Sequence, residues 1–75
     1  MKIDVELDTR GLNCPLPILK AKKALSTMTS GQTLRVVSTD TGSIRDFAAF
    51  CKQTGNELID QQTENSDFIH ILKRR

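Results

Sequence analysis

The sequence places one cysteine where a helix is predicted to begin. Cys14 is followed directly by Pro15 and then by Pro17, and Gly11 lies in the segment before it. Proline suits the first turn of a helix and pushes the preceding residue out of the helical conformation, so Cys14 is predicted to be the N-cap. Its thiol would then lie at the positive end of the helix dipole, which favours the thiolate and predicts a lowered pKa. This pattern favours a nucleophilic cysteine.

The residues around Cys14 are predicted to support its thiol. Arg10 would add positive charge near the sulfur, and Gly11 is free to take a positive φ in the loop. Pro15 and Pro17 stiffen the start of the helix. The alternative is that Cys14 is a small buried side chain without a chemical role. Its position between a glycine-containing loop and a Pro-x-Pro helix start favours the reactive role.

The second cysteine and the single histidine are predicted to be structural. Cys51 lies on the apolar face of a predicted helix, where a free cysteine acts as a small hydrophobe. A resolving or disulfide role for Cys51 stays open as an alternative. His70 is assigned a structural or surface role. With one histidine, no Cys-x-x-Cys, no phosphate-binding glycine loop and no dinucleotide fingerprint, we expect neither a metal site nor a cofactor.

Hydrophobic periodicity predicts six elements in the order β-α-β-α-β-β. Four strands are predicted over residues 2–8, 33–39, 57–63 and 68–73, and two helices over residues 15 to about 28 or 29 and about 44 to 54. Ser43 is the predicted N-cap of the second helix with Asp46 completing a capping box, and Gly55 is its predicted C′ residue. One apolar face of this helix is predicted to consist of Ile44, Phe47, Ala48 and Cys51.

Strand-helix-strand units form right-handed crossovers, so both helices are predicted to cover one face of the sheet. The predicted fold is an α/β (α+β) two-layer sandwich with a mixed four-stranded sheet, built as a single domain over residues 1–75. The register of the last strand stays open. Phe68 and Leu72 alternate with Ile69 and Ile71, and either pair could face the helices.

The first helix has two predicted faces. Its core face is predicted to consist of Ile18, Ala21, Ala24, Leu25 and Met28. Outside this stripe lie four residues that we expect to bind partner proteins, namely Leu16, Leu19, Lys20 and Lys23. Exposed leucines beside lysines are typical of a docking rim for an acidic partner, although a solvated face would look the same.

Composition excludes several classes of protein. The 75 residues are 37% hydrophobic and 27% charged, a globular composition, and no apolar run reaches the roughly 20 residues of a membrane-spanning helix. We expect no membrane association and no export signal, and the two cysteines suit a reducing, cytoplasmic setting. A net charge of +2 is too small to indicate direct binding to nucleic acid.

The chain resembles the TusA/SirA/YedF-like sulfur-carrier family. The resemblance rests on the run Cys14-Pro15-Leu16-Pro17 and on the preceding Gly11-Leu12-Asn13, and it continues through Asp40, Arg45-Asp46 and the segment 55–58. The Asp40-Thr41-Gly42 segment departs from the Asp-Pro of many relatives, which affects the assignment to a subfamily.

The resemblance implies that Cys14 accepts sulfane sulfur as a persulfide and passes it on, as a sulfurtransferase-like carrier and not as a stand-alone catalyst. It implies a cysteine desulfurase or rhodanese-like protein as donor. The implied acceptor is a sulfur-relay protein, for example in tRNA 2-thiouridine synthesis, or one in molybdenum-cofactor or sulfur-oxidation pathways. A monomer is expected, because a small carrier meets its partners transiently.

Two other classes stay open. A regulatory or nucleic-acid-binding module of the same fold would use its basic residues, which are Lys20, Lys22, Lys23, Arg74 and Arg75. The absence of tyrosine and tryptophan for base stacking disfavours this class. A thiol-disulfide protein would use Cys14 and Cys51, but their separation is unlike that of a redox motif.

Overall fold

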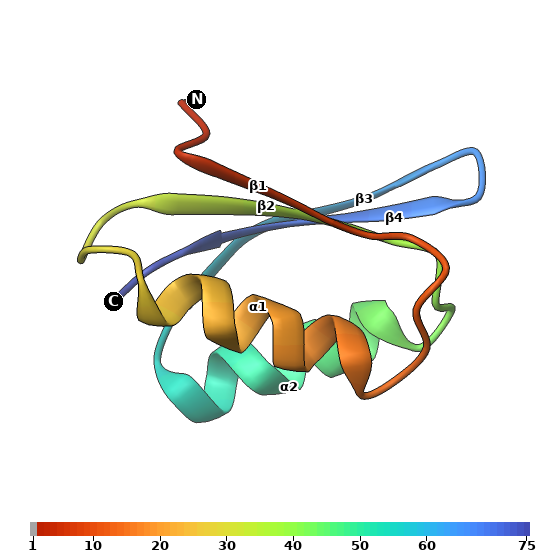
Figure 1. Ribbon diagram of the computed structural model, residues 1–75, viewed down its shortest axis with the longest axis horizontal. Coiled ribbons are helices and arrows are strands. Elements are labelled where there is room, and N and C mark those ends of the chain that lie inside the picture. Colours follow the sequence, from red (N-terminus) through yellow and green to blue (C-terminus); the bar gives the residue numbers. More distant parts are fainter. Residues whose placement is uncertain (1) are drawn as a thin grey trace.

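The computed structural model describes residues 2–75 and confirms the order β-α-β-α-β-β. The elements are β1 (Val5–Thr9), α1 (Leu16–Ser26), β2 (Thr33–Ser38), α2 (Ser43–Thr54), β3 (Glu57–Glu64) and β4 (Asp67–Lys73). Figure 1 shows two layers, with the sheet above and both helices packed against its lower face. The predicted two-layer sandwich is therefore confirmed. Neither α1 nor α2 has the length and apolar character needed to cross a lipid bilayer.

The strands form one mixed sheet in the order β1-β2-β4-β3. β1 and β2 are parallel, as a strand-helix-strand crossover requires, and β4 is antiparallel to both of its neighbours. Leu72 packs in the core against the helices and His70 stacks on Phe47 of α2. Because side chains alternate along a strand, Ile69 and Ile71 lie on the opposite face of β4, which settles the register that the sequence left open.

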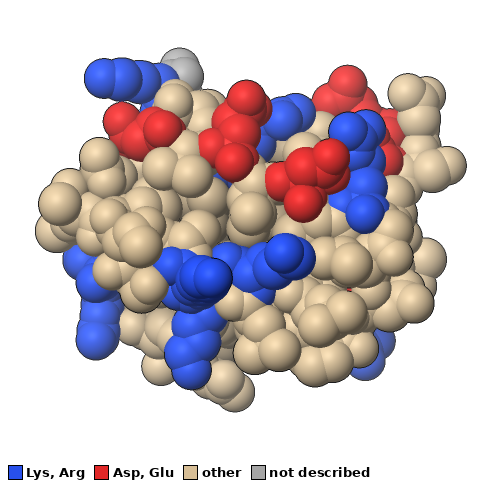
Figure 2. Space-filling model, in the orientation of Figure 1, with Lys and Arg blue, Asp and Glu red and all other residues tan. Residues whose placement is uncertain are grey.

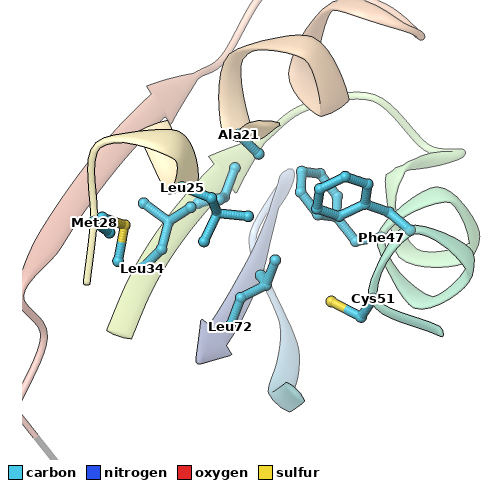
Figure 3. Packing of buried hydrophobic residues seen from close by; sticks show 9 residues of the cluster. Ala21, Leu25, Met28, Leu34, Phe47, Cys51 and Leu72 are labelled. Carbon is cyan, nitrogen blue, oxygen red and sulfur yellow. The ribbon is translucent and has the colours of Figure 1, made fainter. Parts of the chain in front are cut away.

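The core lies between the sheet and the two helices (Figure 3). Its buried members come from every layer, namely Ala21, Leu25, Met28, Leu34, Val36, Phe47, Phe50, Cys51 and Leu72. Ile18 and Ala24 pack against this cluster, which confirms the predicted core face of α1. The rings of Phe47 and Phe50 meet edge-on at a centroid distance of 6.4 Å, a favourable aromatic geometry.

The prediction that Cys14 is the N-cap of α1 is wrong. Pro15 is the N-cap, because its carbonyl accepts the first helical hydrogen bond from the Leu19 N–H at 3.1 Å. The second proline, Pro17, occupies the first turn, where its missing N–H costs no helical bond. The helix also ends at Ser26, before the predicted residue 28 or 29.

The start of α2 also differs from the prediction. Gly42 is the N-cap, Ser43 lies inside the helix, and no side chain caps the helix, so the capping box of Ser43 and Asp46 is not formed. The hydroxyl of Ser43 is instead paired with His70, at 3.0 Å. Ile44 is 38% exposed, and Phe50 is part of the core, so the buried stripe is rotated from the predicted one. Gly55 ends the helix with a φ of 81°, as predicted.

Candidate functional site

Cys14 lies in the loop that joins β1 to α1, at the end of the molecule where the two parallel strands finish. The loop that joins β2 to α2 reaches the same end, on the right in Figure 1. This meeting follows from the topology, because the carboxyl ends of neighbouring parallel strands lie at one edge of a sheet. The start of α2 is therefore brought to the cysteine, although the two are far apart in the sequence.

Backbone hydrogen bonds hold the loop that carries Cys14. Gly11 has a φ of 84°, and its N–H donates to the Thr39 hydroxyl at 2.9 Å, which ties the loop to the end of β2. The N–H of Leu16 donates to the carbonyl of Asn13 at 2.9 Å and so closes a turn around the cysteine.

The thiol of Cys14 is exposed and free, as the sequence predicted. Pro17, just beyond it, is fully buried and anchors the start of α1 against the core. The Cys14–Pro15 peptide bond is cis. The loop, held by the hydrogen bonds of Gly11 and Leu16, therefore presents the Cys14 side chain to solvent.

The prediction of a lowered pKa for Cys14 is wrong. Hydrogen bonding of the thiol to the Asp46 carboxylate is the largest cause that raises its pKa, followed by desolvation and by the negative charges of Asp46 and Asp40. The sequence argument considered the dipole of α1 and the positive charge of Arg10. It could not count Asp46 of α2 or Asp40 in the loop before it, both of which raise the pKa.

Asp40 and Asp46 form an acidic pair beside Gly42. A Cβ atom at Gly42 would lie 3.7 Å from the Oδ2 atom of each carboxylate, so the pair closes around this glycine. Oδ2 of Asp40 is buried and has no hydrogen-bond partner within residues 2–75. The sequence analysis did not assign either residue to the site. The predicted topology could have indicated them. Asp40 precedes α2 and Asp46 lies in its first turn, and the parallel pairing of β1 and β2 brings this helix start to the same edge of the sheet as Cys14.

Arg10 is paired with two carboxylates. Its guanidinium donates twice to the Asp8 carboxylate, from Nε at 3.0 Å and from Nη2 at 3.1 Å, and lies 3.8 Å from Asp67. It is not among the groups that shift the pKa of Cys14. Arg10 therefore braces the beginning of the loop.

The predicted partner-binding residues are exposed on α1. Leu16 is 46% exposed and Leu19 is 53% exposed, which are large values for leucine. Lys20 and Lys23 line a groove between α1 and β1, whereas Lys22, with Arg74 and Arg75, lines a different cavity. The five basic residues that a nucleic-acid-binding module would use therefore line two separate cavities.

Cys51 is buried, as predicted, and His70, which was assigned a structural or surface role, is fully buried. Cys51 is 4% exposed, and desolvation raises the pKa of its thiol to about 11, so it is chemically quiet. Both cysteines are free. Within residues 2–75, no group of His, Cys, Asp and Glu side chains has the arrangement of a metal site.

Comparison with known proteins identifies the family. The family model described as sulfurtransferase TusA matches residues 5–74. The chain belongs to the TusA family. The sulfur carrier protein TusA of Allochromatium vinosum is 58% identical over 71 residues, which cover 95% of this chain and 93% of that protein. The putative sulfur carrier protein YrkI of Bacillus subtilis is 45% identical over 69 residues, covering 92% and 91% of the two chains.

The same fold occurs in a solved structure. The SirA-like protein of Desulfitobacterium hafniense superposes with a TM-score of 0.80 and 21% identity, over 92% of this chain and 95% of that one. The TusA resemblance inferred from the Cys-Pro-Leu-Pro run is therefore confirmed, and so is the fold class.

Replacing Asp46 with asparagine is expected to lower the pKa of Cys14. The substitution removes the negative charge and the anionic hydrogen-bond acceptor that raise it. Because each pKa unit changes the thiolate fraction about tenfold, alkylation by iodoacetamide near neutral pH should accelerate several-fold. Glu57→Gln, at an exposed position that begins β3, is the matched control. An unchanged pH profile of alkylation in Asp46→Asn would contradict the assignment.

Proposed function

We propose that this protein is a sulfur carrier that receives sulfane sulfur on Cys14 as a persulfide and relays it to an acceptor protein. The observation that carries the proposal is the exposed, free thiol of Cys14 on a fixed loop, in a chain of the TusA family. Relatives that match nearly the whole chain bear the name sulfur carrier. A carrier must offer its sulfur to two proteins in turn, and an exposed thiol at one end of a small domain permits this.

The chemistry consists of two displacements at sulfur. The Cys14 thiolate attacks the terminal sulfur of a donor persulfide; the Cys14–sulfur bond forms, the donor's sulfur–sulfur bond breaks, and the donor leaves as a thiolate. In the second step an acceptor thiolate attacks the terminal sulfur on Cys14 and releases the Cys14 thiolate. The sulfur atom is transferred from one thiol to another without net oxidation or reduction, so the reaction needs neither metal nor cofactor.

Asp46 is proposed to hold the resting thiol in its protonated form. Hydrogen bonding to its carboxylate is the largest cause of the raised pKa of Cys14, and in this proposal the carboxylate accepts the proton when Cys14 attacks. That proton then serves the departing donor thiolate. A carrier whose thiol is protonated at rest reacts slowly with small oxidants, because the thiolate is the reactive form.

The supporting residues act through the backbone in this proposal. Gly11 allows the turn that ties the loop to Thr39, Pro15 caps α1, and Pro17 anchors it. Arg10 is assigned to the brace with Asp8 and not to the sulfur. Residues 1–75 are proposed to act as a single carrier domain.

The proposed partners are a cysteine desulfurase or rhodanese-like donor and a downstream relay protein in the cytoplasm, for example in tRNA 2-thiouridine synthesis. The exposed leucines Leu16 and Leu19, at the beginning of α1, are proposed to contact both partners during transfer.

Sulfur loading tests this function. The protein is incubated with a cysteine desulfurase and cysteine, and its intact mass is then measured with and without a thiol reductant. We expect a gain of one or more sulfur atoms that the reductant removes, with the added sulfur located on the peptide containing Cys14 by fragmentation. No gain from either a desulfurase or a thiosulfate-fed rhodanese would refute the carrier function.

A further inference from the structure

Strand β1 forms an open edge of the sheet. Its only strand neighbour is β2, so one row of its backbone N–H and C=O groups has no strand partner. An exposed edge of this kind is a template for another extended segment, which can add to the sheet by main-chain hydrogen bonds. The edge spans five residues, Val5–Thr9, which is a usual strand length.

A groove runs beside this edge. It has a volume of about 290 Å³ and lies between β1 and α1, lined by Leu7, Ala24, Thr27, Lys20 and Lys23. Its floor is apolar, because Leu7 and Ala24 pack against the core and reach the surface only in part. A strand added to β1 would project every second side chain into this groove, since side chains alternate along a strand.

The side chains on the two sides of the β1 edge carry opposite charge. Lys20 and Lys23 stand on the α1 side, and neither forms a salt bridge within the part of the chain that the structure describes. Glu6 and Asp8 project from the other face of β1, where they pair with Arg35 and Arg10. Figure 2 shows this division, with basic side chains across the lower half of this face and most acidic ones along the upper part.

We propose that the open edge of β1 and the adjoining groove accept an extended segment of a partner protein as a fifth strand. The segment carries acidic side chains where it faces Lys20 and Lys23, an apolar side chain over Leu7 and Ala24, and neutral or basic side chains at the alternate positions near Glu6 and Asp8. This inference rests on the proposed function in one respect: a carrier must bind protein partners. It names the kind of segment that they would present.

A second copy of this chain fits the edge less well. Pairing of β1 with β1 of another copy would bring Glu6 and Asp8 of both chains onto the same face of the joined sheet. Like charges opposite each other destabilise a strand pair. The same charges protect the edge against self-association, which is how natural proteins guard exposed strands. The charges therefore favour a different protein with complementary alternation.

The test uses the full chain with Cys14→Ser, so that sulfur chemistry plays no part. The probe is a capped seven-residue peptide with glutamate, valine and glutamate at alternate positions and lysine or threonine between them. We expect NMR to show exchange of alternate amides within Val5–Thr9 slowed by about tenfold at saturation, because edge amides become hydrogen-bonded. A peptide with lysine in place of both glutamates, and one with proline in place of the valine, should bind at least about tenfold more weakly.

Protein variants complete the test. The double variant Lys20→Glu, Lys23→Glu should weaken peptide binding about tenfold, whereas Lys22→Glu, on the same helix but lining another cavity, should change it less than about twofold. Binding without slowed exchange in β1, equal loss in Lys22→Glu, no binding at millimolar peptide, or self-association through β1 would each overturn the proposal. Sulfur uptake by the unaltered chain from inorganic polysulfide is measured separately, so failure of the carrier function is recognised independently of peptide binding.

Discussion

Replacing Cys14 with serine will leave a folded protein that takes up no sulfur. The side chain is exposed and belongs to no part of the core, so its loss should change the free energy of unfolding by less than about 0.5 kcal/mol. A hydroxyl cannot form the persulfide, so loading should fall to the background of the assay. Intact-mass measurement after incubation with a cysteine desulfurase and cysteine reads this directly.

Cys51→Ala is the matched control for this loss. Cys51 is buried, and the pKa of its thiol is raised to about 11, so it should neither receive sulfur nor react with iodoacetamide until the protein unfolds. The variant should be destabilised by about 1 kcal/mol through the lost sulfur contacts and yet load normally. Loading that survives in Cys14→Ser and disappears in Cys51→Ala would reverse the assignment of the two cysteines.

Acid is expected to destabilise the fold through His70. The ring is fully buried, stacks on Phe47 at 4.5 Å, and lies 3.0 Å from the Ser43 hydroxyl and 3.1 Å from Nε2 of Gln61. Nε2 of Gln61 donates one hydrogen to the Ile44 carbonyl and directs its other hydrogen at the ring of His70. Nδ1 of His70 is therefore the acceptor, and the proton of the neutral ring lies on Nε2 of His70. A second proton on Nδ1 would displace that bond.

The pH range over which acid destabilises the protein follows from the pKa of His70 in the unfolded and folded states. Burial lowers the pKa of His70 from 6.5 to about 4, so between these values the unfolded chain binds more protons than the folded one. Stability is therefore complete above pH 6.5 and is lost as the pH falls toward 4, by about 3 kcal/mol in total. Urea unfolding at a series of pH values measures it.

His70→Gln supplies the reference for this measurement, because glutamine does not titrate. Carboxylates with lowered pKa values, such as Asp4 and Asp8, also destabilise the protein in acid, but they do so equally in both proteins. The difference between wild type and variant should therefore shrink as the pH falls from 6.5 to 4. A difference that stays constant over this range would show that the folded and unfolded chains bind protons equally at His70, and would contradict a pKa lowered by burial.

Local patterns in the sequence were sufficient for the architecture. Alternation in the strands and the 3.6-residue period of α1 act between near neighbours, so they predicted the element order and the core face of α1. Cys14 as the exposed thiol, Cys51 as a core residue and Gly55 as the end of α2 follow from the same short-range physics. The helix starts were misplaced by one residue because the caps depend on the backbone geometry of the turn.

The charge environment of Cys14 was decided only by the tertiary structure. Electrostatic interactions act through space, and the crossover from β1 to β2 brings Asp40 and Asp46 to a cysteine that is distant in the chain. Hydrogen bonding to Asp46, desolvation and the two negative charges raise the pKa of Cys14, opposite to the direction that the helix dipole alone predicts. The pairing of Arg10 with Asp8 and Asp67, the burial of His70 and the open edge of β1 arise in the same way, because each depends on which elements the fold makes neighbours.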